Sequence, residues 1–149
     1  MKIFLLEDDI IYQDLFKEDL ENLGHEVRVH GYVQDAVKTV LEERFDLLII
    51  DISLPENIET KGKEIRDGGI KVLEELILND EFTLPPVFFV SIYGYDECKE
   101  RIDSLHKEGM NKGYDKVGNL YLQKPYNSIF FVETVRKIQK VKQEDSNGE

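Results

Sequence analysis

The sequence has little cysteine, no long apolar run and no excess of positive charge. Its single cysteine, Cys98, excludes an intramolecular disulfide and a zinc site built from thiolates alone. The apolar opening Ile3–Leu6 is far shorter than the roughly 20 residues of a membrane-spanning helix. With 19 Lys and Arg against 31 Asp and Glu, the net charge is −12, which argues against contacts with nucleic-acid phosphates or anionic lipid. We therefore expect a soluble, cytoplasmic protein with no direct DNA binding and no membrane association.

Length and composition indicate one folded domain. The 149 residues suit a single domain of ordinary size. The chain is 41% hydrophobic and 34% charged, which is typical of a globular protein and not of a disordered one. We place the domain at residues 1–140 and expect the polar residues 141–149 to form a disordered tail.

Short apolar runs alternate along the chain with segments of helical periodicity. Three runs, Ile3–Leu6, Leu47–Ile50 and Val87–Val90, are typical of strands that are buried on both faces. Two weaker candidates are Val27–Val29 and Leu120–Leu122. Each run is followed by apolar residues spaced three or four apart, as in an amphipathic helix. The repeated strand–helix order predicts an α/β fold with a five-stranded parallel sheet and helices on both of its faces.

Charged and hydroxyl side chains stand where four of these strands end. Glu7 and Asp8 follow the first strand, Asp51 the third, Ser91 the fourth and Lys124 the fifth. Because the carboxyl ends of parallel strands meet at one edge of a sheet, we expect these side chains to lie together. Three carboxylates repel one another and favour a bound cation, and ligands that are all oxygen suit Mg²⁺. With a lysine and a hydroxyl beside them, they predict an electrostatic site for a phosphoryl group on or near Asp51.

These motifs resemble, in order and context, the receiver domains of bacterial two-component response regulators, with the single-domain chemotaxis type as the nearest pattern. The resemblance covers roughly residues 1–140 and implies a doubly wound, flavodoxin-like sheet. It implies that Asp51 accepts a phosphoryl group from the phosphohistidine of a sensor histidine kinase or a histidine phosphotransfer protein. Ser91 and Lys124 would contact the phosphoryl oxygens. Tyr121 is similar to the switch aromatic, which turns inward as the hydroxyl residue moves toward the phosphoryl group.

The resemblance also implies a set of ligands for Mg²⁺. Asp8 is similar to the acid that binds the metal directly, and Glu7 matches its neighbour, which often acts through water. Asp51 would touch the metal as well, and Ser53 would lend its backbone carbonyl.

The spacing departs from the family in two places. Asp51 and Ser91 are separated by 40 residues, and Ser91 and Lys124 by 33, each about ten more than is usual for a receiver. The excess falls in residues 56–68 and 110–119. We therefore expect an extended connection between the third strand and the third helix, and another between the fourth helix and the fifth strand.

The sequence predicts a phosphorelay receiver with no output domain, which switches protein–protein contacts with a downstream target as a monomer or weak dimer. It would be no enzyme beyond its own aspartyl phosphorylation and dephosphorylation. Two alternatives stay open. A degenerate receiver, which binds proteins independently of phosphorylation, is favoured by the bulky Ile92, where the family mostly has Ala or Gly. A phosphatase of the aspartyl-phosphate type needs a second Asp two residues after Asp51, where this chain has Ser53.

Overall fold

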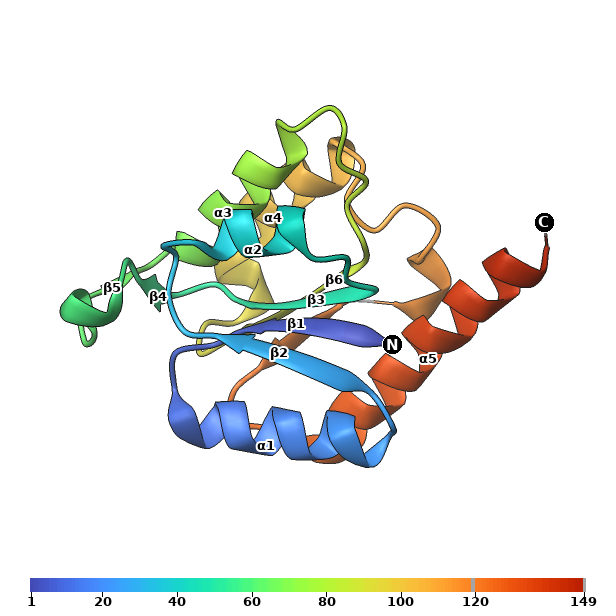
Figure 1. Cartoon of the computed structure of the whole chain (residues 1–149), viewed down its shortest axis with the longest axis horizontal. Helices are drawn as coiled ribbons and strands as arrows, with labels where there is room; N and C mark the ends of the chain where they lie inside the picture. The colour runs from blue at the N-terminus through green and yellow to red at the C-terminus, as the bar shows by residue number, and fades with distance from the viewer. Residues whose placement is uncertain (119, 149) are drawn as a thin grey trace.

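The chain folds into a parallel sheet with helices on both faces (Figure 1). The computed structural model describes residues 1–118 and 120–148. The strands are β1 (Lys2–Leu6), β2 (Glu26–His30), β3 (Leu47–Asp51), β4 (Leu54–Pro55), β5 (Glu64–Ile65), β6 (Val87–Ser91) and β7 (Tyr121–Gln123). The helices are α1 (Ile10–Asn22), α2 (Ala36–Glu42), α3 (Gly68–Ile77), α4 (Tyr95–Lys107) and α5 (Ser128–Asn147).

The sheet has the predicted parallel, doubly wound topology. Among the described residues, five strands pair in the order β2-β1-β3-β6-β7, and every neighbouring pair is parallel. Every residue of β3, the central strand, is buried. The strand order reverses between β1 and β3, and ligands of open α/β sheets bind beyond the carboxyl ends of strands at such a point. The predicted fold class is therefore confirmed.

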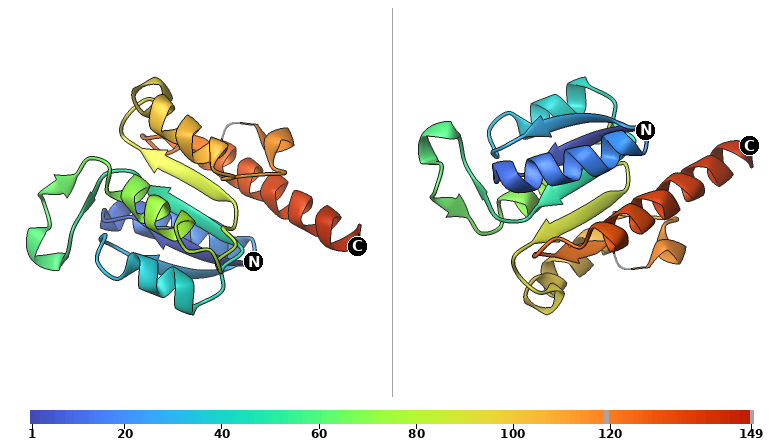
Figure 2. Two further views of the ribbon diagram at one scale, coloured as in Figure 1. Left: turned by 90° about the horizontal axis from the view of Figure 1, so that it is seen from above. Right: turned by 90° about the horizontal axis from the view of Figure 1, so that it is seen from below.

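The core is divided by the sheet into two layers. Helices α1 and α5 cover one face, while α2, α3 and α4 cover the other (Figures 1 and 2). On the first face, Phe16 of α1 packs against Phe131 of α5 with ring centroids 4.8 Å apart. Phe131 also packs against Phe88 of β6, at 5.7 Å. These aromatic contacts hold α1 against α5, and α5 against β6, the strand that ends in Ser91.

A glycine allows α3 to approach the end of β3. A Cβ atom on Gly69 would overlap the carbonyl oxygen of Asp51 and would come within 2.7 Å of Cγ2 of Ile50. The Gly69 N–H donates to the carbonyl of Ile52 at 3.0 Å, so the helix is fixed at this position. The close packing of α3 against the backbone at Asp51 thus depends on the absence of a side chain at residue 69.

We expect Gly69→Ala to lower the free energy of unfolding by about 1–3 kcal/mol, the usual cost of overpacking. Gly94→Ala is the matched control, because its Cβ would lie 3.5 Å from Oε1 of Gln123, an ordinary contact. Urea denaturation of both variants measures the difference. Equal stability of the two variants would contradict the close approach at Gly69.

The extended connection after β3 forms an antiparallel hairpin of two short strands, β4 and β5, where the sequence indicates only a loop. Leu54 pairs with Ile65 and Pro55 with Glu64. A turn of 3-10 helix, Ile58–Thr60, lies between the strands. We call residues 54–66 the inserted hairpin. It projects from the edge of the sheet at which the strands end (Figures 1 and 2).

The second extended connection packs against the end of α5. It contains a turn of 3-10 helix, Asp115–Val117, and Lys116 lies 3.4 Å from Oε2 of Glu144. Asn119, which belongs to the connection predicted at residues 110–119, lies outside the described residues.

The structure continues α5 through residues 141–147, which the sequence assigns to a disordered tail. Val141 is buried, so the apolar spacing of the helix extends past the predicted boundary at residue 140. The ion pair at Glu144 adds a contact beyond that point. Glu149 lies outside the described residues. In the part of the chain that the structure describes, no helix combines the length and apolar character needed to cross a bilayer.

Candidate functional site

The strand ends bring the predicted site residues to one edge of the sheet. Glu7 and Asp8 directly follow β1, and Asp51 is the last residue of β3. Ser91 is the last residue of β6, and Lys124 directly follows β7. The backbone N–H of Lys124 donates to the carbonyl of Ser91 at 2.7 Å, which ties the last two strand ends together.

Lys124 joins two carboxylates inside the protein. Its Nζ donates to Oε1 of Glu7 at 2.7 Å and to Oδ2 of Asp51 at 3.1 Å. The exposed fractions of the three side chains are only 7%, 0% and 5%, so water screens these contacts weakly. The ring of Tyr12 lies 4.3 Å from the ammonium group. Burial alone would lower the pKa of Lys124, but the charge of Asp51 and the hydrogen bonds to Glu7 and Asp51 outweigh it and raise the pKa.

Crowding of carboxylates favours bound protons or a bound cation. Burial, reinforced by Asp51, raises the pKa of Glu7 to about 9. Burial and the charge of Asp51 raise the pKa of Asp8 to about 6. Oε2 of Glu7 is buried and has no hydrogen-bond partner among the described residues. At neutral pH the Glu7 carboxyl therefore retains a proton that a metal ion can displace.

The three acids fit a hard divalent cation. Glu7, Asp8 and Asp51 each offer an oxygen, and these oxygens lie within 4.8 Å of one another. That spacing suits octahedral Mg²⁺, whose ligand oxygens lie about 2.1 Å from the metal. Ser53 adjoins them, and its N–H donates to Oδ1 of Asp51 at 3.1 Å. The predicted use of the Ser53 carbonyl as a ligand stays a prediction.

Asp51 opens onto a cleft. The cleft has a volume of about 350 Å³. Its described walls carry the carboxylates of Asp8, Asp9, Asp51 and Glu64 and the cations of Arg66 and Lys124. Ile92, the bulky residue where the family mostly has Ala or Gly, also lines the cleft, with 61% of its surface exposed.

Ser91 and Tyr121 meet through the backbone of Tyr93. The hydroxyl oxygen of Ser91 accepts from the N–H of Tyr93 at 3.0 Å. The hydroxyl of Tyr121 donates to the carbonyl of Tyr93 at 2.6 Å. Tyr121 is buried, with its ring 5.5 Å from that of Tyr95, and burial is the main cause of its raised pKa. The two predicted switch residues are therefore linked, and Ser91 is not among the described residues that line the cleft.

The sequence gives no sign that Glu64 and Arg66 line this cleft. Both come from the inserted hairpin, which folds back beside Asp51. The available signal was the extra length between Asp51 and Ser91, together with its mixed charge. Length alone does not say which of these residues return to the sheet edge.

Fold and site define a doubly wound α/β protein with an acidic, lysine-containing cleft at its topological switch point. No family model matches the chain. The chain is 31% identical over 126 residues to the transcriptional regulatory protein CrdR of Helicobacter pylori, covering 85% of this chain and 49% of that protein. It is 26% identical over 134 residues to the polar-differentiation response regulator DivK of Brucella anthropi, covering 90% and 92%. Its fold matches the chemotaxis protein CheY4 of Vibrio cholerae with a TM-score of 0.67, at 18% identity, over 92% of this chain and 97% of that one.

The chain has the fold of receiver domains and is similar in sequence to response regulators. The predicted resemblance is thereby confirmed. The chain spans about half the length of the Helicobacter relative and nearly all of the Brucella one.

Proposed function

We propose that this receiver works in a two-component phosphorelay, in which Asp51 accepts a phosphoryl group in the presence of Mg²⁺. The donor would be the phosphohistidine of a sensor histidine kinase or a histidine phosphotransfer protein. The supporting observation is the position of Asp51 at the end of the central strand, facing a cleft, with Nζ of Lys124 3.1 Å from Oδ2. A carboxylate held in this way is a suitable nucleophile, since its orientation is fixed.

In the proposed reaction, an Asp51 oxygen attacks phosphorus, and the P–N bond of the phosphohistidine breaks as the new P–O bond forms. The imidazole leaves with the electron pair and takes up a proton. Lys124 moves its hydrogen bonds toward a phosphoryl oxygen, and the Ser53 N–H keeps the other carboxylate oxygen oriented. Glu7, Asp8 and Asp51 would hold Mg²⁺, which neutralises charge on the transferred group.

The receiver would act through protein contacts with a downstream target and would turn over no external substrate. Its net charge of −12 favours a protein partner over DNA for this domain. A cytoplasmic location and a monomeric or weakly dimeric state stay predictions.

We expect Asp51→Asn to abolish phosphorylation without unfolding the protein, because the amide keeps the shape of the carboxylate and loses the nucleophile. Intact-protein mass after incubation with acetyl phosphate and Mg²⁺ tests this. Asp9→Asn is the matched control, since it removes a neighbouring acid from the wall of the same cleft. Labelling of Asp51→Asn at the wild-type rate would refute the assignment.

The second candidate function is a degenerate receiver that binds partners without phosphate. The observation in its favour is Ile92, whose bulky, exposed side chain lines the cleft. No phosphoryl gain from acetyl phosphate or phosphoramidate, together with no binding of beryllium fluoride, would support this alternative.

We expect Tyr121→Ala to be phosphorylated at the wild-type rate but to lose the conformational response, because Tyr121 contacts the Tyr93 backbone and does not line the cleft. Backbone amide NMR signals of Ser91 and Tyr93, recorded before and after phosphorylation, report the response. Equal loss of phosphorylation and response would contradict the switch role.

A further inference from the structure

The inserted hairpin brings a second cation to the phosphoryl cleft. Arg66 follows β5 directly and lines the cleft together with Asp51 and Lys124. Lys124 already bonds to two carboxylates, whereas 60% of the Arg66 side chain is exposed. Arg66 is therefore the more available cation among the described residues that line the cleft.

The present contacts of Arg66 orient it and are easily exchanged. The guanidinium carbon lies 4.6 Å from the centre of the Tyr93 ring, so the planar group stacks on that ring. Its Nη2 lies 3.4 Å from Oε2 of Glu97 on α4, and both side chains are exposed. Exposed ion pairs of this kind add little stability. Replacement of the Glu97 carboxylate by a phosphoryl group, as the partner of Arg66, thus costs little free energy.

The acidic walls of the cleft favour a second cation beside the phosphoryl group. Asp8, Asp9 and Glu64 line the cleft in addition to Asp51. These carboxylates disfavour an incoming phosphoryl donor, which is itself anionic. A guanidinium offers paired N–H donors that match phosphoryl oxygens and keeps its charge at every physiological pH.

We propose that Arg66 binds the phosphoryl group at Asp51, an inference that rests on the proposed function. The guanidinium leaves Glu97, stays stacked on Tyr93 and donates to phosphoryl oxygens. Since the backbone of Tyr93 also bonds to the hydroxyls of Ser91 and Tyr121, Arg66 connects the inserted hairpin with Tyr93 and, through Tyr93, with these two residues.

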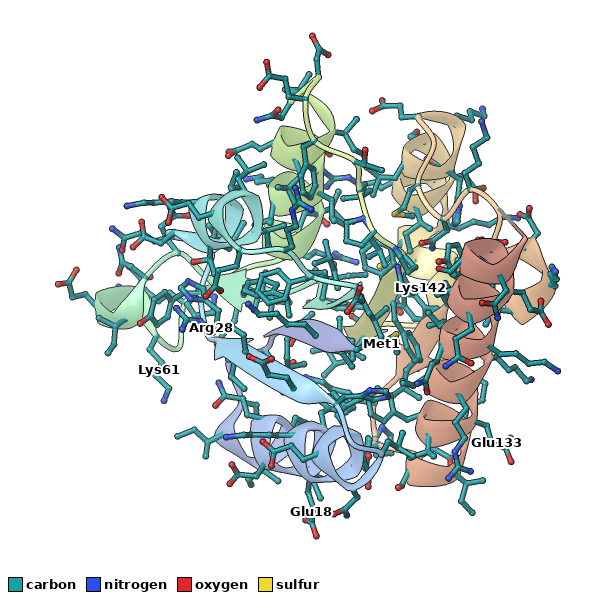
Figure 3. All side chains as sticks on the ribbon, turned by 45° about the vertical axis from the view of Figure 1, so that its right-hand side comes forward. Met1, Glu18, Arg28, Lys61, Glu133 and Lys142 are labelled. Atoms are coloured by element: carbon teal, nitrogen blue, oxygen red, sulfur yellow. The ribbon has the colours of Figure 1, made fainter. Side chains whose placement is uncertain are left out.

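Binding of beryllium fluoride in the presence of Mg²⁺, which mimics the phosphoryl group, tests this role. We expect Arg66→Ala to weaken binding about tenfold and Arg66→Lys to lie between it and wild type. Lys61→Ala is the matched control, with the same charge removed from the same hairpin. Lys61 is not among the described residues that line the cleft, and its side chain points away from the fold (Figure 3). Lys61→Ala should bind like wild type.

The affinity for Mg²⁺, measured without beryllium fluoride, distinguishes two explanations of weaker fluoride binding by Arg66→Ala. Either Arg66 recognises the charge of the phosphoryl group, or the substitution disrupts the inserted hairpin. Arg66→Ala removes a positive charge near the metal site, so its affinity for Mg²⁺ should stay the same or increase. A parallel loss of Mg²⁺ affinity would overturn the proposal in favour of a structural role.

The ion pair with Glu97 supplies a second test. We expect Glu97→Gln to strengthen fluoride binding only when Arg66 is present, which a double-mutant cycle measures. An equal effect of Glu97→Gln in the Arg66→Ala background would overturn the proposed exchange. If wild type binds and Arg66→Ala binds equally well, the Arg66 proposal alone is refuted. Absence of binding in wild type refutes the proposed function together with it.

Discussion

Mg²⁺ should bind this protein more tightly as the pH rises from about 6 to about 9. The ion must displace the proton of Glu7, whose pKa is raised to about 9, while Asp8, at about 6, is already ionised over this range. Release of one proton per metal ion makes the Kd fall roughly tenfold for each pH unit. Below pH 6 a second proton is released and the slope steepens. Titration calorimetry in buffers of different pH measures both the Kd and the protons released.

Two variants show which acid causes the dependence of the Kd for Mg²⁺ on pH. Glu7→Gln should flatten the dependence between pH 6 and pH 9, because no proton remains to be displaced there. Asp9→Asn should keep the wild-type slope, since Asp9 does not belong to the group of three acids. A Kd independent of pH in wild type would contradict the protonation of Glu7.

The same raised pKa values make stability depend on pH when metal is absent. Glu7 and Asp8 titrate near 4.5 and 3.8 when unperturbed, but near 9 and 6 in the fold. Between these limits the folded protein holds protons that the unfolded chain has lost. The free energy of unfolding should therefore decrease as the pH rises from about 4 to about 9. Saturating Mg²⁺ should reverse part of this decrease.

Lys124→Met should lower the free energy of unfolding by about 3 kcal/mol at neutral pH, the scale for breaking a buried ion pair. The substitution leaves the buried carboxylate of Asp51 beside Glu7 with no cation. Lys116→Met is the matched control, because its partner Glu144 lies 3.4 Å away on the surface and the pair is exposed. That change should cost less than about 1 kcal/mol. Denaturation in urea without metal compares the two.

A double variant identifies the cause of the loss. Asp51→Asn added to Lys124→Met should recover most of the stability, because it removes the uncompensated charge. No recovery would indicate that Lys124 contributes through packing, including its contact with Tyr12, instead of through charge. A loss no larger than that of Lys116→Met would also contradict the charge assignment.

The sheet was predictable because its strands are buried on both faces. Runs such as Leu47–Ile50 and Val87–Val90 are short, continuous and apolar, and each coincides with a strand. The inserted hairpin was not predictable in this way, since its strands have two residues each and show no periodicity. Its order depends on local hydrogen bonds, such as that from the Thr60 N–H to Oδ1 of Asn57 at 3.1 Å.

The sequence predicts less well which face of a helix packs on the core than where a strand ends. The sequence predicts one inward apolar face made of Ile11, Leu15, Leu20 and Leu23. Ile11 is instead 69% exposed, and of the four only Leu20 is buried. Phe16 takes the inner position instead, because its ring fits against Phe131 and Tyr126. Apolar spacing alone did not distinguish these neighbouring faces of one helix.

The site was predictable where strand ends determine position. The meeting of Glu7, Asp51 and Lys124 follows from parallel topology, whatever the loops do. The places of Arg66 and Tyr93 at the cleft depend on the conformations of the inserted hairpin and of the loop after β6, which no periodic pattern of apolar residues predicts. The position of Tyr121, turned inward onto the Tyr93 carbonyl, likewise depends on the loop after β6 and on the ring of Tyr95 in α4.

The most direct test of the central claim is to locate the phosphoryl group in the chain. Treatment with acetyl phosphate and Mg²⁺, reduction with borohydride to convert phosphoaspartate to homoserine, and tandem mass spectrometry of the peptides would identify the modified residue. We predict homoserine at position 51 and an unchanged residue at Asp8 and Asp9. Modification at another residue, or at none, would contradict the assignment of Asp51 as the phosphoacceptor.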